Sequence, residues 1–138
     1  MATRISPAER VTTIGQHAGM ERSIAISRPL VGSERLYSSI VTTAPRGRTR
    51  IHHHGACETS IYIVSGAARY TWGPTGVEHE MQAATGDFVY IPAGEIHVEE
   101  NASNEQPLVV ILSRNCPDSH VVYVDGGPDG SGDVPAPC

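Results

Sequence analysis

The sequence predicts one small all-β domain, because short apolar runs rich in β-branched residues alternate with frequent turn residues. The 138-residue chain holds 14 glycines and 10 prolines, which separate the runs and mark turns. Val, Ile, Tyr and Thr are frequent in these runs, and a helical period is present only weakly, over residues 7–14. Many short strands in one domain indicate a sandwich, a barrel or a jelly roll, and the periodicity alone does not choose among them.

The expected elements divide the chain into three parts. Residues 1–30 carry little core signal, so we interpret them as an N-terminal arm. Residues 31–125 form the predicted barrel. Residues 126–138 are rich in Gly and Pro and are expected to be a flexible C-terminal tail. The clearest strands are expected at residues 36–43, 60–64, 88–91 and 108–112.

The charge and composition exclude several functions. A net charge of −5 argues against a nucleic-acid partner, which normally meets a basic surface. All ten basic residues are arginine, which excludes Schiff-base chemistry on lysine. No apolar run approaches the ~20 residues of a membrane span, so we expect no membrane partner. The first residues lack the apolar stretch of a signal peptide, so a cytoplasmic location is expected.

The three cysteines do not suggest a disulfide framework. Cys57, Cys116 and Cys138 are odd in number, widely spaced and without a C-x-x-C pair. The sequence therefore predicts free thiols in a reducing compartment.

A histidine and carboxylate cluster is the main candidate site. If residues 48–54 are extended, His52 and His54 point to one face of the chain and His53 points to the other. A turn after His54 would bring the Glu58 carboxylate back beside the two imidazoles. Imidazole with carboxylate suits Fe, Mn, Co, Ni, Cu or Zn, whereas the alternative is a loop of surface histidines.

A second segment, residues 86–101, favours a metal site over a loop of surface histidines. Its fixed positions, Gly86, Pro92, Gly94, His97 and Asn101, match the second signature of the cupin family.

Residues 47–66 resemble the first cupin signature, a His-x-His followed by a glutamate and a glycine. Two spacings depart from the pattern: four residues instead of five separate Gly47 from His52, and seven instead of six separate Glu58 from Gly66.

The resemblance to cupins implies a conical antiparallel barrel, the jelly roll also called a double-stranded β-helix, with a metal inside. By the same resemblance, His52, His54, Glu58 and His97 would bind one divalent transition metal. Fe(II) is favoured, and Zn, Ni, Mn, Cu and Co remain open. Such a ligand set leaves positions for water, a small-molecule substrate or dioxygen.

Two residues are expected to act beside the metal. Glu58 is a candidate base toward the substrate. Arg50 shares the parity of His52 and His54, so a regular strand would aim it at the site as an anchor for an anionic group. The alternative for Arg50 is a structural pairing with a nearby glutamate.

The favoured function is a mononuclear Fe(II)-type dioxygenase acting on a small organic molecule. The first alternative is a redox-neutral cupin with Zn, Ni or Mn: an isomerase, an epimerase, a lyase or an N–N bond-forming protein. The second is a non-catalytic cupin that binds a small ligand or a metal. Because cupins commonly pair through strands, the resemblance also implies a homodimer.

Overall fold

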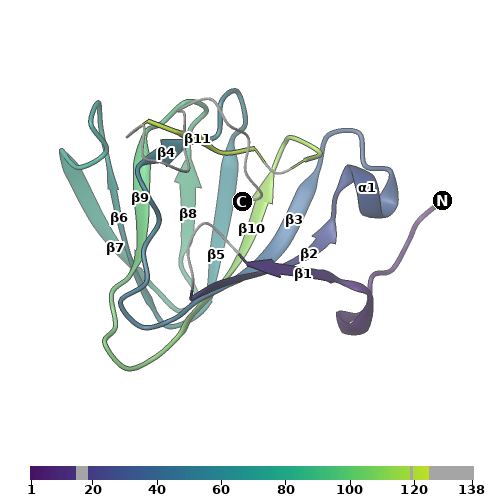
Figure 1. The fold of residues 1–138 in the computed structure, drawn as a ribbon, viewed down its shortest axis with the longest axis horizontal. Helices are drawn as coiled ribbons and strands as arrows, with labels where there is room; N and C mark the ends of the chain where they lie inside the picture. Colours follow the sequence, from purple (N-terminus) through teal and green to yellow (C-terminus); the bar gives the residue numbers. More distant parts are fainter. Residues whose placement is uncertain (15–18, 119, 125–138) are drawn as a thin grey trace.

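The computed structural model describes residues 1–14, 19–118 and 120–124, and these form two antiparallel sheets that enclose one interior (Figure 1). The strands of the first half are β1 (Val11–Ile14), β2 (Met20–Ile26), β3 (Tyr37–Thr43), β4 (His52–His53), β5 (Thr59–Ser65) and β6 (Ala67–Trp72). The later strands are β7 (His79–Ala84), β8 (Phe88–Ile91), β9 (His97–Asn101), β10 (Leu108–Arg114) and β11 (Val122–Tyr123). Two short helices, η1 (Pro7–Glu9) and α1 (Arg28–Val31), complete the described residues, and neither is long enough to cross a membrane.

The strand order shows a jelly roll. One sheet has six strands in the order β1-β2-β3-β10-β5-β8, and the other has five in the order β11-β4-β9-β6-β7. β10 lies between β3 and β5, so strands far apart in the sequence are side by side (Figure 1). The predicted all-β jelly-roll fold is confirmed.

Alternate residues of both sheets build one core. β3 and β10 bury every second side chain, as expected for strands with one face toward the core. The core cluster unites the two sheets and comprises Met20, Tyr37, Val41, Ile61, Ile63, Ala68, Tyr70, Ala83, Val89, Ile91, Leu108, Val110 and Leu112. This shared interior is where the polar site described below is also located.

The segment interpreted as an N-terminal arm contributes to the sheet. β1 and β2 form a hairpin, and β2 pairs with β3. Met20 joins the core, while the next inward residue is the buried Arg22. An arginine at an inward position hides the apolar alternation of β2, which explains the weak core signal. The predicted tail, residues 126–138, lies outside the described residues.

The prediction of free thiols is wrong for two cysteines. Cys57 and Cys116 form a disulfide with a Cα–Cα distance of 5.8 Å, although 59 positions separate them in the sequence. β5 pairs with β10 so that Thr59 lies opposite Arg114, which brings the residues flanking these strand ends together. The pairing depends on long-range register, which cysteine spacing does not reveal. Cys138 lies outside the described residues.

Candidate metal centre

Three histidines meet inside the jelly roll at the end of the smaller sheet. β4 pairs with β9 so that His52 lies directly opposite His97, and His54 follows two residues after His52. The nitrogens they offer lie within 4.8 Å of one another. The three side chains are buried, with 2–4% of each residue exposed. The structure thus brings together three of the four predicted ligands, His52, His54 and His97. His53 points the other way, and its Nδ1 accepts a hydrogen bond from the Gly55 amide at 2.9 Å.

Backbone carbonyls hold each imidazole in the tautomer that a metal requires. Nδ1 of His52 lies 2.7 Å from the Arg50 carbonyl, Nδ1 of His54 lies 2.7 Å from the His120 carbonyl, and Nδ1 of His97 lies 2.8 Å from the Glu95 carbonyl. A carbonyl only accepts, so each Nδ1 carries the hydrogen when the ring is neutral. Each Nε2 therefore keeps a lone pair, which is the usual arrangement of a metal-binding histidine.

The surroundings keep these rings neutral. Burial, followed by the neighbouring His97, holds the pKa of His52 well below its ordinary value. Burial and the Arg114 guanidinium do the same to the pKa of His54. Burial lowers the pKa of His97 to about 4. Neutral imidazoles at neutral pH can donate their lone pairs to a cation without first losing a proton.

A turn before β9 aims His97 inward, as its sequence predicts. The Glu95 amide donates to the Pro92 carbonyl at 3.2 Å, and Gly94 has a φ of 75°. This left-handed conformation is readily available to glycine, which has no Cβ. The turn places Glu95 so that its carbonyl orients His97 two residues later.

The structure does not bring Glu58 to the three histidines. Glu58 lies just before β5 and is exposed, and there Tyr90 Oη donates to Oε1 at 2.6 Å and Asn115 Nδ2 donates to Oε2 at 3.1 Å. The Glu58 amide also donates to Asn115 Oδ1 at 2.8 Å. The predicted fourth ligand is thus held by exposed partners on the opposite face of the strand.

The unusual spacing to Gly66 accounts for this position. Six residues separate Thr59 from Gly66, which is the spacing that the cupin signature gives to its glutamate. Thr59 is 2% exposed and faces the interior, whereas its neighbour Glu58 faces out, because successive side chains of a strand alternate. The spacing to Gly66 was therefore the sequence signal that could have placed Thr59 on the inward face and Glu58 on the outward face.

An arginine that the sequence interpretation missed lies beside the histidines, in contact with Thr59 and His54. Arg114, at the end of β10, is 2% exposed. Its Nε donates to Thr59 Oγ1 at 3.2 Å, and its Nη2 lies 3.3 Å from His54 Nε2. The parity of Arg114 with the inward Leu112 and Val110 was the available sequence signal.

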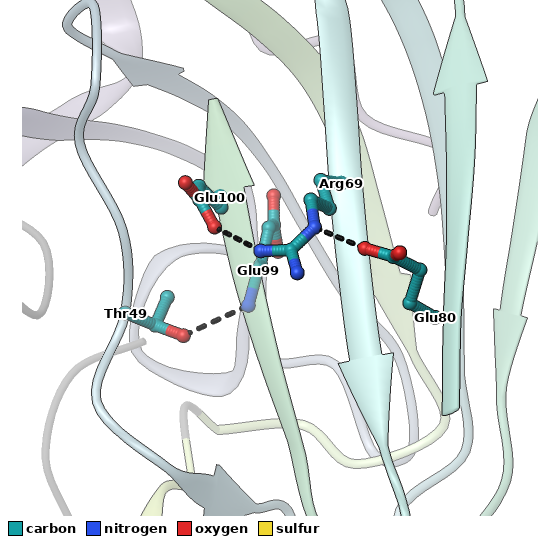
Figure 2. A network of polar contacts seen from close by, with 5 residues as sticks. All are labelled: Thr49, Arg69, Glu80, Glu99 and Glu100. Carbon is teal, nitrogen blue, oxygen red and sulfur yellow. Dashed lines mark hydrogen bonds and ion pairs between the residues drawn. The ribbon is translucent and has the colours of Figure 1, made fainter. Parts of the chain in front are cut away.

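A buried carboxylic acid lies on the same inward face as His97. Glu99 is 7% exposed, and burial raises its pKa to about 7 against the opposing effects of Arg114 and Tyr70. Its amide donates to Thr49 Oγ1 at 3.0 Å, as Figure 2 shows, and the Thr49 amide donates to its carbonyl at 2.9 Å. These backbone bonds fasten the segment before β4 to β9.

Arg50 does not follow the alternation that the sequence suggested. Thr49 is already buried, and a bend at Ile51 precedes the inward His52, so the regular parity from residue 50 to residue 52 is lost. The Arg50 guanidinium lies 4.1 Å from the centre of the Tyr123 ring. The carbonyl of Arg50 orients His52, whereas its role as a substrate anchor stays a prediction.

The Arg50 side chain lines a separate cavity of about 500 Å³ on the outer side of β6 and β9, with Arg48 and Arg69 among the other lining residues. None of the three clustered histidines lines it. Figure 2 shows Arg69 reaching between Glu100 of β9, at 2.9 Å, and Glu80 of β7.

The last described strand covers the histidines. β11 pairs with β4, and Tyr123 lies opposite His52. Val121 and Tyr123 are 0% and 4% exposed, and the His120 carbonyl bonds to His54. Figure 1 shows β11 crossing the same end of the molecule as β4. Among the described residues, this segment therefore lies over one side of the cluster.

Comparison with known proteins places this geometry in a family. A cupin domain model matches residues 39–113, which is more than half of the chain and includes all three histidines. The chain belongs to the cupin family. Among curated proteins, none matches the sequence.

Several solved cupins share the fold. A structure of oxalate decarboxylase from Bacillus subtilis at pH 4.6 is 28% identical, with a TM-score of 0.68 over 78% of this chain and 28% of its own. An S161A mutant of the same enzyme is 25% identical, with a TM-score of 0.70 over 82% of this chain and 30% of its own. A third structure, 27% identical with a TM-score of 0.69 over 79% of this chain and 29% of its own, comes from work on the Mn(II) centres of that enzyme. The chain spans less than a third of the length of these cupins.

The three histidines fit one divalent transition metal. Three converging lone pairs on neutral imidazoles form the kind of donor set that Zn, Fe, Co, Ni and Cu accept. Three protein ligands leave further positions for other groups, as in catalytic sites and unlike closed structural ones. The donor set alone does not identify the metal.

Proposed function

We propose that this cupin is a redox-neutral, metal-dependent enzyme of the lyase type, acting on a small organic molecule at His52, His54 and His97. The observation that carries the proposal is the set of three neutral nitrogen donors without a carboxylate among the described residues that meet there. Neutral ligands leave the positive charge of a divalent ion uncompensated. Such an ion, when bound, would act as a Lewis acid toward a carbonyl or carboxylate group.

The residues around the histidines support this proposal. The carbonyls of Arg50, Glu95 and His120 fix the imidazoles, and burial excludes bulk water from the cluster. Glu99 faces the same interior and, with a pKa raised to about 7, is suited to hold or release a proton near neutral pH. The solved neighbours add support, since they are decarboxylases and one is described with Mn(II) centres.

A Fe(II) dioxygenase is the second candidate, because three imidazoles also suit iron. Glu58 does not supply the carboxylate of a two-histidine, one-carboxylate iron site in this geometry, which favours the redox-neutral reaction. A binding module without turnover is the third candidate.

One experiment separates the three. The untagged protein is purified without added metal, its metal content is measured by elemental analysis, and it is then assayed with oxalate and related small acids for CO₂ release and oxygen uptake. Bound metal with CO₂ release and no oxygen uptake is expected. Stoichiometric iron with oxygen uptake would support the dioxygenase, and metal without turnover of any acid would support the binder.

A further inference from the structure

Arg114 is a buried cation whose hydrogen bonds are incomplete. The residue is 2% exposed, and its Nη1 is buried without a hydrogen-bond partner. Among the described residues, the ion pairs belong to Arg28 and Arg69, and none involves Arg114. A buried charge is normally paired, because removing it from water is costly.

No described carboxylate bonds directly to Arg114. Nε donates to the neutral Thr59 hydroxyl, and the guanidinium lies 5.6 Å from the centre of the Tyr37 ring. Glu99 is the buried carboxyl group that interacts with Arg114, but its Oε1 also lacks a hydrogen-bond partner. The two groups therefore face a common interior without forming a direct bond.

Nη2 of Arg114 can bond to His54 only while His54 binds no metal. Nη2 lies 3.3 Å from His54 Nε2, and this nitrogen has a lone pair because Nδ1 bonds to the His120 carbonyl. A metal ion on Nε2 would take that lone pair. Arg114 would then present two buried N–H groups, on Nη1 and Nη2, beside the metal position.

We propose that Arg114 binds a carboxylate group of the ligand next to the metal held by the three histidines. A guanidinium offers two parallel N–H groups, which match the two oxygens of a carboxylate. The anion would replace the missing charge at Arg114 and would also offset the charge of a metal bound by three neutral ligands. This inference rests on the proposed function for the metal and adds the residue that would bind a carboxylate group of the ligand.

The proposal predicts that metal binding at the histidines and anion binding at Arg114 affect each other, and the sign of this effect can be measured. Arg114 repels a cation at His54, so metal binding is opposed until an anion arrives, and by linkage the anion binds better when metal is present. Removing the guanidinium should make metal binding at least as tight without an anion, and should abolish the effect of the anion. A residue with only a structural role would produce neither change.

The test uses the full chain loaded with Co(II), whose visible spectrum reports its ligands. Acetate and formate are titrated as probes, with formamide as the neutral control. Wild type is expected to show a spectral change with the two carboxylates only. Arg114→Met should weaken acetate binding by about tenfold or more, the size of effect expected for hydrogen bonds to a charged group, while still binding Co(II). Arg69→Met is the matched control, since it removes the same charge from the outer face of β6, and it should behave as wild type.

A second variant and a measurement on the metal-free protein separate failure of the Arg114 proposal from failure of the proposed function. If Arg114→Met does not fold, Arg114→Lys keeps the charge but not the two parallel donors, and acetate binding weaker than wild type is still expected. Equal acetate affinity in wild type and a folded Arg114 variant would overturn the inference while leaving the metal site intact. If wild type binds no Co(II), the proposed function is overturned. Acetate-dependent thermal stabilisation of the metal-free wild type but not of the variant would then support the anion site, and equal stabilisation would overturn it.

Discussion

Each imidazole of the histidine cluster is fixed through the nitrogen that points away from the metal position. The three supporting groups are all backbone carbonyls, so their positions depend on the fold and not on the identity of a neighbouring side chain. The acidic side chain that the family pattern assigns to the site lies elsewhere, Thr59 takes its place on the inward face of β5, and Arg114 contacts Thr59 and His54. Single-residue substitutions can therefore separate the three-histidine site from a four-ligand site.

His97→Asn should lose bound metal, whereas Glu58→Gln should retain it. The asparagine keeps a donor for the Glu95 carbonyl but removes Nε2, one of three converging nitrogens. Glu58 contacts Tyr90 and Asn115 and is not in the cluster. Equilibrium dialysis against Co(II) or Zn(II), followed by elemental analysis, should show a several-fold loss for His97→Asn alone. Loss of metal in Glu58→Gln would show that the carboxylate moves into the site.

The buried histidines should make the metal-free protein sensitive to acid. The pKa of His97 falls from an ordinary 6.5 to about 4 on folding, so between these values the unfolded chain binds a proton that the folded chain does not. The free energy of unfolding should therefore fall as the pH is lowered from 6.5 to 4, by on the order of 3 kcal/mol for this residue. Urea titrations at several pH values should show a shallower slope for His97→Asn. An unchanged slope would mean that His97 is already protonated or exposed in the folded protein.

At the scale of the strands, a buried asparagine fastens the end of β9 to the loops around it. Asn101 is 2% exposed, and its Nδ2 lies 2.8–3.2 Å from the carbonyls of Thr43, Ala44 and Gln106. Its Oδ1 accepts from the Ser103 amide at 2.9 Å. The asparagine of the second cupin signature thus ties β9 to the segments that follow β3 and precede β10.

Asn101→Ala should lower the free energy of unfolding by about 2–3 kcal/mol, since it leaves several buried polar groups without partners. Asn104→Ala is the matched control, because Asn104 is exposed and accepts only from Arg46 among the bonds described. The control should stay within about 0.5 kcal/mol of wild type in urea denaturation. Equal losses in both variants would show that the loop and not the buried amide carries the effect.

The disulfide ties the start of β5 to the segment after β10. Replacing both Cys57 and Cys116 with serine should lower the free energy of unfolding by about 2–4 kcal/mol, as expected when a long loop is no longer closed. A reductant should have the same effect on wild type and none on the double variant. Mass measurement with and without a thiol-blocking reagent gives a direct check, and two reactive thiols at Cys57 and Cys116 in the native protein would contradict the structure.

The elements differ in how well the sequence predicts them, and the difference follows the range of the interactions. His52 and His54 were predictable from alternation within one strand, and Gly94 from the local needs of a turn. Arg114 and the disulfide arise where β5 meets β10, and that register is set by packing across the whole sheet. Glu58 faces outward because one extra residue separates it from Gly66, and successive side chains of an extended chain point to opposite faces.

At the scale of the whole molecule, the outer face of the six-stranded sheet exposes an aromatic patch. Phe88 and Tyr90 are 73% and 59% exposed, Ile111 is 40% exposed, and Tyr62 packs against Phe88 with ring centres 4.8 Å apart. Exposed patches of this kind are typical of protein interfaces. We propose that the expected homodimer forms through this face.

Phe88→Asp should shift the protein from dimer to monomer, because it places a charge in the patch at its most exposed side chain. Val77→Asp is the matched control, since Val77 is 60% exposed but lies near the outer cavity of the other sheet. Light scattering after size exclusion should show the shift for Phe88→Asp only. A monomeric wild type, or a dimer that survives Phe88→Asp, would rule out pairing through this face.

The cover formed by residues 120–123 also sets an order of events during synthesis. The ribosome makes His52, His54 and His97 before the segment that closes over them, so all three ligands exist while the end of the site is still open. A metal captured at that stage is enclosed when β11 pairs with β4. The metal found in the cell would then reflect which ion is available at the moment of translation as well as which ion binds most tightly.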